Sequence, residues 1–228
     1  MTTISVVSAI WGERYRQFLP RWWDSVQALE RQPEQVVIIT DRQCFELAHS
    51  TKPFGYKVPT KILGLHDELT FNEYYDRAYQ ECEMEWLAIC CIDDVFVPEA
   101  LNDIDKADEA GCEMVADGVK FTNQSRIWKG YWNPSEIYRN MTMPGAAPMK
   151  KAMYERVGWP KDIYWSDWAF YMKCAKAGVK VYQSDLIRII FDEGYNHKTQ
   201  SGQQLDPDTR AFANQQIGEF AAKLQSEN

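Results

Sequence analysis

The sequence has no excess of positive charge: 25 lysine and arginine residues face 33 aspartate and glutamate residues, which gives a formal net charge of −8. A chain this acidic does not adhere broadly to nucleic acid or to an anionic membrane, although a local basic pocket for a diphosphate is compatible with it. No apolar run is long enough to span a bilayer, and the N-terminal MTTISVVSAIWGERY lacks a basic stretch before its apolar residues. These absences predict a cytoplasmic protein with no transmembrane segment.

The six cysteines form no C-x-x-C pair and show no metal-ligand spacing. Cys90 and Cys91 are adjacent in an apolar run, so in a strand they point to opposite faces and cannot easily pair. We therefore expect reduced, partly buried thiols. No G-x-G-x-x-G motif follows the first expected strand, which argues against a dinucleotide-dependent oxidoreductase.

The N-terminal half alternates between strand-like and helix-like stretches, and 228 residues suffice for one large α/β domain. A β-rich stretch predicts a strand over 4–10, apolar runs predict strands over 35–40 and 86–92, and 56–63 is expected to form a short strand between them. Helical spacing of apolar side chains predicts helices over 13–30 and 70–83, and Pro98 fits the first turn of another helix, over 98–110. This alternation implies βαβ units and a mainly parallel sheet with helices on both faces.

The C-terminal half is less regular. We expect a strand over 113–121, helices over 149–157 and 167–177, strands over 179–182 and 186–191, and a terminal helix from Asp206-Pro207. The stretch 122–148, rich in aromatic residues and asparagine, is typical of a long binding loop. The single expected domain divides into a nucleotide-binding half (1–110), an acceptor-side half (111–200) and a C-terminal helical tail (201–228).

Polar residues stand where parallel sheets bind ligands, beyond the carboxyl ends of the strands: Trp11-Gly12-Glu13, Asp41 and Asp93-Asp94. Adjacent carboxylates repel each other unless a cation lies beside them, and Mg²⁺ sites are built from such carboxylates, substrate phosphates and water. A solvated turn, in which Asp93 and Asp94 accept backbone hydrogen bonds, explains the pair equally well.

A second acidic candidate opens the helix expected at 167–177. Ser166 is a natural N-cap, and an acid at Asp167 suits the helix dipole. Alternatively, Asp167 is a general base whose partial desolvation between two tryptophans raises its proton affinity. His197, which follows the last expected strand, is either a polar surface residue or a metal ligand.

The order of these features resembles the GT-A fold of family-2 glycosyltransferases. The matching segments are ISVVSAIWGERY, VVIITD, FNEYYDRAYQ, WLAICCIDDVFVPEAL, PGAAPMKKAMYERVGWP and WSDWAFYMKCAKAGVKV, with His197 after them. None is specific alone, and their shared order carries the resemblance. It implies an α/β domain of GT-A type, with a mainly parallel central sheet, helices on both faces and an irregular acceptor-side region.

The resemblance also implies a function: metal-dependent, inverting transfer of a sugar from a nucleotide-diphosphate sugar to an acceptor hydroxyl. Because UDP-sugars are common donors in the family that the sequence resembles, the resemblance implies a UDP-sugar donor, with Mn²⁺ or Mg²⁺ as cofactor. Asp167 would be the catalytic base. The donor-binding residues would be Ala9, Trp11, Asp41, Asn72 and Asp93, the metal ligands Asp94 and His197, and the acceptor-side candidates Trp132, Trp165 and Ser166. Whether Asp93 or Asp94 is the principal metal ligand stays open.

Two other functions fit parts of the pattern. A catalytically degenerate protein of the same fold would bind a nucleotide or glycan without turnover, and metal-dependent hydrolysis of a nucleotide-sugar would argue against it. A nucleotidyltransferase would carry a glycine-rich basic loop after the first strand, where only Gly12, Arg14 and Arg16 stand. The sequence does not identify the acceptor, which is a glycan, a small molecule or a modified nucleic acid.

Overall fold

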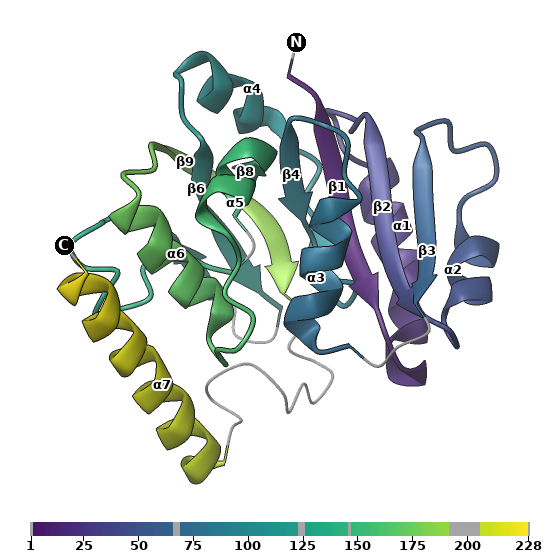
Figure 1. The fold of residues 1–228 in the computed structure, drawn as a ribbon. Coiled ribbons are helices and arrows are strands. Elements are labelled where there is room, and N and C mark those ends of the chain that lie inside the picture. Colours follow the sequence, from purple (N-terminus) through teal and green to yellow (C-terminus); the bar gives the residue numbers. More distant parts are fainter. Residues whose placement is uncertain (1, 66–68, 123–125, 146, 192–205, 228) are drawn as a thin grey trace.

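The computed structural model describes residues 2–65, 69–122, 126–145, 147–191 and 206–227. Its centre is a nine-stranded sheet with the order β3-β2-β1-β4-β8-β6-β9-β5, in which β7 pairs with β6 (Figure 1). The expected α/β architecture is confirmed.

The N-terminal half supplies four adjacent parallel strands: β1 (Ile4–Ile10), β2 (Gln35–Asp41), β3 (Thr60–Leu65) and β4 (Trp86–Ile89). β1 and β2 are buried along almost their whole length, as expected for apolar runs that are covered on both faces. Since the strands are parallel, their carboxyl ends meet at one edge of the sheet. This edge lies at the bottom in Figure 1.

The C-terminal half extends the sheet with the long parallel strands β6 (Met114–Phe121) and β9 (Val181–Phe191). The two-residue β8 (Met149–Lys150) pairs antiparallel with both β4 and β6, so β4, β6 and β9 all run in the same direction. The short β5 (Val95–Phe96) and β7 (Ile127–Lys129) are antiparallel to their neighbours. The sheet is therefore mixed and mostly parallel, as predicted.

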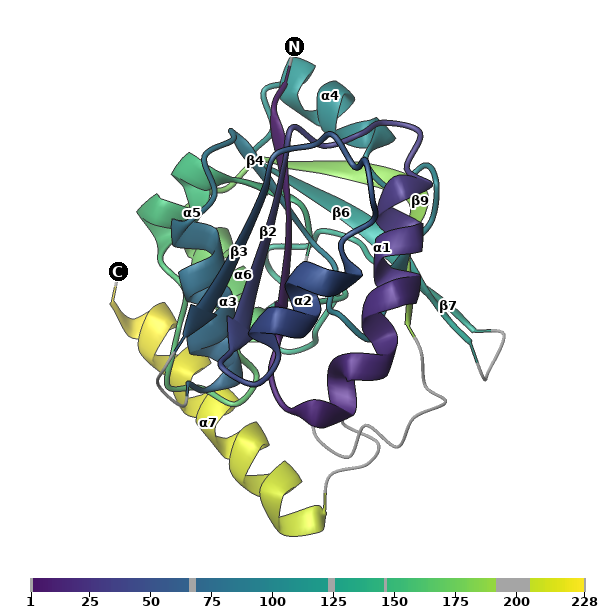
Figure 2. The same cartoon turned by 90° about the vertical axis from the view of Figure 1, so that its right-hand side faces the viewer.

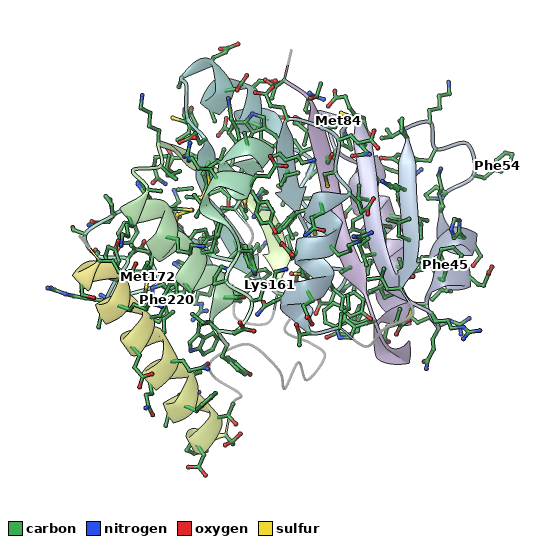
Figure 3. All side chains as sticks on the ribbon, viewed as in Figure 1. Phe45, Phe54, Met84, Lys161, Met172 and Phe220 are labelled. Atoms are coloured by element: carbon green, nitrogen blue, oxygen red, sulfur yellow. The ribbon has the colours of Figure 1, made fainter. Side chains whose placement is uncertain are left out.

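Helices cover both faces (Figure 2). One core contains side chains of α1 (Leu19–Gln27), α2 (Phe45–Thr51) and α4 (Asn102–Glu109). The other contains side chains of α3 (Phe71–Gln80), α5 (Lys151–Val157), α6 (Ser166–Lys176) and α7 (Pro207–Ser226). α7 packs on α6, and Met172 and Phe220 mark this contact in Figure 3. No helix among these described residues is both long and apolar enough to cross a membrane.

Local sequence explains the ends of the helices that frame the site. Thr70 caps α3 in a capping box with Glu73, which satisfies backbone N–H groups that would otherwise lack partners. Asp206 caps α7, and Pro207 occupies its first turn. Gly178 follows α6 with a φ of 66°, a left-handed conformation that favours glycine.

Several element boundaries differ from the expectation. The helix expected over 13–30 begins as a 3₁₀ helix (Glu13–Phe18) and ends at Gln27. The two strands expected over 179–182 and 186–191 are one strand, β9, whose register against β6 shifts around Gly118. Such an irregularity keeps a strand continuous while breaking its alternation. Pro98 precedes α4 instead of entering it, and α2 was not predicted.

Candidate active site

Asp41 joins the loops that follow β1 and β2. One carboxylate oxygen accepts the Gly12 N–H (2.6 Å) and the other accepts the Cys44 N–H (2.7 Å). Gly12 has a φ of 79°, so the turn after β1 favours glycine at this position. Each carboxylate oxygen has a further lone pair, so Asp41 retains the capacity to accept a hydrogen bond from a ligand.

Trp11, at the carboxyl end of β1, stacks on Tyr74 of α3, with ring centroids 5.2 Å apart and planes 11° from parallel. The indole is partly buried and contacts both cores. Ala9, two residues earlier, is fully buried and pairs with Ile39 of β2. Of these two donor-binding candidates, Trp11 reaches the ligand edge of the sheet and the Ala9 side chain belongs to the core.

An acidic turn follows β4. The Asp94 N–H donates to the Cys91 carbonyl (3.0 Å), which folds the chain back on itself. Consequently one ligand atom from each of Cys91, Asp93 and Asp94 lies within 4.8 Å of the others. Arg21 of α1 donates a hydrogen bond to the Asp93 carbonyl, which brings a positive charge to the turn. Cys91 and Arg21 were not predicted as site residues.

Hydrogen bonding and electrostatics tie the Cys91 sulfur to this turn. The Tyr75 hydroxyl hydrogen-bonds to the sulfur, and burial raises the pKa of Tyr75 well above its ordinary value, so this phenol stays protonated. Burial and the charges of Asp94 and Asp93 raise the pKa of the Cys91 thiol. A nearby cation has the opposite effect, because it favours the thiolate.

The donor atoms in this turn fit a divalent cation. Two carboxylates and a sulfur converge there, and Asp94 is 7% exposed. His197, the other expected ligand, lies outside the described residues. The chain enters that segment close to the turn, because Val95 pairs with Ile190 near the end of β9.

A buried ion pair supports the acidic turn from inside the sheet. Arg188 of β9 donates to the Asp117 carboxylate (2.5 Å) and to the Ile89 carbonyl at the end of β4 (2.7 Å). Its own carbonyl accepts the Val97 N–H (3.0 Å) just beyond the turn. The two charged side chains are 1% and 3% exposed. Arg188 thus holds the chain on both sides of the Asp93-Asp94 turn.

Asp167 lies in the first turn of α6, and its two carboxylate oxygens differ in their surroundings. Oδ1 accepts the Trp168 N–H (2.8 Å), whereas Oδ2 faces Gly145, where an added Cβ would lie 2.9 Å away. Burial raises the pKa of Asp167, as a general base requires. Tyr171 holds the facing segment, since its hydroxyl donates to the Pro144 carbonyl (2.8 Å) and accepts the Ala147 N–H (3.2 Å).

Gly145→Ala is expected to lower the rate of catalysis by displacing the Asp167 carboxylate. A side chain misplaced by about 1 Å costs roughly 100-fold in rate. We therefore expect kcat to fall by about that factor, with an unchanged KM for the donor, in a steady-state transfer assay. Gly218→Ala on α7 is the matched control, because nothing lies within 4 Å of its added Cβ. Equal values of kcat for Gly145→Ala and Gly218→Ala would contradict the expectation that crowding at Gly145 displaces a catalytic Asp167 carboxylate.

Asn72 connects α3 to the start of α6, a role that differs from the predicted contact with the donor. Its amide nitrogen donates to the carbonyls of Lys161 (3.0 Å) and Ile163 (3.3 Å), and its oxygen accepts the Ser166 hydroxyl (2.5 Å). Lys161, labelled in Figure 3, also pairs with Asp76 of α3 (2.6 Å). Asn72 is therefore a positioning residue for the segment that precedes Asp167.

Asn72→Ala is expected to reduce kcat and leave the KM for the donor unchanged. The variant breaks the hydrogen bonds that hold the loop, and because these bonds are exposed or partly buried, each contributes about 0.5–1.5 kcal/mol. Thermal unfolding and steady-state kinetics measure the two effects. Ser166→Ala removes only one of these bonds, so its effects should be smaller. A rise in the KM for the donor alone, with unchanged stability, would instead indicate that Asn72 contacts the donor.

Comparisons with known proteins find similarity in structure but not in sequence. A scan against protein-family models finds no match, and no curated protein matches the sequence. The crystal structure of S. aureus TarS 1–349 with UDP-GlcNAc matches 99% of this chain and 73% of that chain, with a TM-score of 0.68 at 16% identity. The mannosyltransferase PcManGT from Pyrobaculum calidifontis, with GDP-Man and Mn²⁺, matches 99% of this chain and 74% of that chain, with a TM-score of 0.64 at 12% identity. This chain has a GT-A fold.

The structural match spans nearly all of this chain but less than half of a longer TarS structure. The match to a longer TarS structure covers 99% of this chain and 44% of TarS. The resemblance inferred from the order of the sequence segments is confirmed for the fold.

On the predicted acceptor side of the GT-A fold, the candidates lie around α6. Ser166 is buried and bonded to Asn72, and Trp165 directly precedes it with a partly buried ring. The Trp132 ring is partly buried against the same core, and the backbone N–H of Trp132 donates to the Gln183 side-chain oxygen (3.2 Å). Their acceptor-binding role stays a prediction.

Proposed function

We propose that this protein is a metal-dependent, inverting glycosyltransferase that moves a sugar from a nucleotide-diphosphate sugar to an acceptor hydroxyl. The convergence of Asp93, Asp94 and Cys91 beyond β4, on a GT-A fold, carries the proposal. The TarS structure is a complex with UDP-GlcNAc, and the PcManGT structure is a complex with GDP-Man and Mn²⁺. We take a UDP-sugar as the first donor to test and Mn²⁺ or Mg²⁺ as the cofactor.

The residues of the chain divide the work between two places. Asp93 and Asp94 hold the cation, and Trp11 and Asp41 bind the nucleoside at the ends of β1 and β2. When bound, the divalent ion supplies Lewis-acid stabilisation of the departing diphosphate. His197 is the further ligand we propose.

Asp167 acts on the acceptor. The acceptor oxygen forms a bond to the anomeric carbon as the bond from that carbon to the phosphate oxygen breaks, and Asp167 takes the hydroxyl proton. Attack opposite to the leaving group, with a single base and no covalent sugar–enzyme intermediate, inverts the anomeric centre. Burial favours the protonated product state of Asp167, which helps it to accept this proton.

The pH dependence of transfer should report the Asp167 carboxyl. Burial raises its pKa above the ordinary value of about 3.9, and the base must be ionised to act. The rate should therefore fall as the pH drops through this raised pKa, at a higher pH than for an ordinary aspartate. A profile of kcat at saturating donor and metal measures this limb. A rate that stays flat until the protein unfolds would exclude Asp167 as the titrating base.

A thermal-shift panel tests the proposal. Purified protein is heated with each of several nucleotide-sugars, with and without Mn²⁺. A shift that needs both Mn²⁺ and one donor supports the metal-dependent site, and slow metal-dependent hydrolysis of that donor favours an enzyme over a degenerate binding protein. If no nucleotide-sugar shifts the melting temperature with any divalent ion, the proposal fails.

A further inference from the structure

Cys91 is placed differently from the buried cysteines of the chain. Cys90 lies in the core on the α1 face and is fully buried, while Cys91 packs at the edge of the core on the α3 face and is only partly buried. The Cys82 thiol, two residues beyond α3, lies inside the core on the α3 face and donates to the Ala78 carbonyl (3.2 Å). Among the cysteines of the part of the chain that the structure describes, Cys91 is the one whose sulfur groups with the carboxylates of the acidic turn.

The distances in the turn allow one ion to contact all three side chains. The sulfur and the two carboxylate oxygens lie within 4.8 Å of one another. Two ligands on opposite sides of one ion, with bonds of about 2.3 Å to sulfur and 2.2 Å to oxygen, lie at most about 4.5 Å apart. Cys91 and Asp93 are partly exposed and Asp94 is buried, so we expect rotations of the first two side chains to close the difference.

We propose that the Cys91 sulfur is a direct ligand of the cation, together with Asp93 and Asp94, and that this donor set favours thiophilic divalent ions over Mg²⁺. The inference rests on the metal site of the proposed function and adds the identity of its third ligand. Mg²⁺ selects oxygen ligands, whereas a thiolate selects softer metals such as Zn²⁺ and its heavier relative Cd²⁺.

Tyr75 provides the support that a sulfur ligand needs. Its hydroxyl bonds to the sulfur, and the ring is 2% exposed, so its position is fixed by the α3 packing. A hydrogen bond from a second residue to a ligand orients that ligand and tunes the metal, and its loss typically costs 10–100-fold in metal affinity. Tyr75→Phe should therefore weaken Cd²⁺ binding within that range without removing the sulfur–metal bond.

The test uses Cd²⁺ alone, because a cadmium–thiolate bond has its own ultraviolet absorption. Metal-free full-length protein is titrated with Cd²⁺ while this band and the bound metal are measured. We expect one strong Cd²⁺ site with a thiolate band. Cys91→Ser should abolish this band and weaken Cd²⁺ binding at least about tenfold. Cys112→Ser, the other partly buried cysteine, is the matched control and should keep both.

Cys91→Asp supplies the complementary variant, since it restores an oxygen donor at the same position. This variant should bind Mg²⁺ more tightly than the parent protein and Cd²⁺ less tightly, with circular dichroism confirming that each variant is folded. Strong Cd²⁺ binding without a thiolate band, or with a band that survives Cys91→Ser, would overturn the role of Cys91 and leave the carboxylate site intact. A chain that binds neither Cd²⁺ nor Mn²⁺ would overturn this inference and the proposed function together.

Discussion

Asp167→Asn is expected to reduce sugar transfer by about 10²–10⁴-fold, the usual contribution of a positioned general base. Asparagine has nearly the same shape but cannot take the acceptor proton. The fall should appear in kcat, while the affinity for the nucleoside diphosphate stays unchanged because Asp93 and Asp94 lie in a separate turn. Steady-state kinetics and calorimetric binding of the nucleotide measure the two quantities.

The stability of this variant distinguishes a catalytic role from a structural one. Because burial raises the pKa of Asp167, its ionised form destabilises the folded protein at neutral pH. Asp167→Asn should therefore melt at the same temperature as the parent protein or higher. Asp162→Asn changes an exposed acid in the loop before α6 and should leave kcat unchanged. An Asp167→Asn protein that is folded and fully active would remove Asp167 from the mechanism.

Arg188→Met should give the largest loss of stability. Removing one partner of a buried ion pair leaves the other charge uncompensated, which costs about 3–5 kcal/mol. Asp117 already lacks a partner at one oxygen among the described residues, and burial raises its pKa even with Arg188 present. For a chain of this length, about 2–4 °C per kcal/mol gives a fall in Tm of about 6–20 °C. Thermal unfolding followed by circular dichroism measures it.

The double variant Arg188→Met/Asp117→Leu is the control for the ion pair. Replacing both charges by apolar side chains is often neutral, so most of the lost stability should return. Arg188 also donates to the Ile89 carbonyl, so the affinity for Mn²⁺ should stay reduced in the double variant. A single Arg188→Met variant that melts within about 2 °C of the parent would contradict the proposed importance of this pair.

The strand ends were predictable because β1, β2 and β4 consist mainly of β-branched and other apolar residues. Asp41, Asp93 and Asp94 stand where those runs stop, and parallel pairing brings them to one edge. The position of Asp167 in the first turn of α6 was equally readable, because Ser166 and Asp167 directly precede an apolar helical pattern. Their roles in catalysis stay predictions.

The remaining features depend on contacts between distant segments. Cys91 was expected to be one of several reduced, partly buried thiols without a role in the site, because an apolar run with two cysteines does not reveal which one faces the turn. The continuity of β9 was missed because Asp185 interrupts its apolar pattern, while pairing with β6 carries the strand through. Asp117 in β6 and Arg188 in β9 are opposite charges flanked by apolar residues, and the spacing of apolar residues alone did not predict that they form a buried ion pair.

The most direct test of a cation at the end of β4 is calorimetric titration of uridine and guanosine diphosphate into the protein, in Mn²⁺ and in EDTA. We expect at least one nucleotide to bind only in Mn²⁺, and we expect Asp94→Asn to abolish that binding while the fold is retained. Binding that is equally tight in EDTA, or unchanged in Asp94→Asn, would contradict a metal-held diphosphate at this turn.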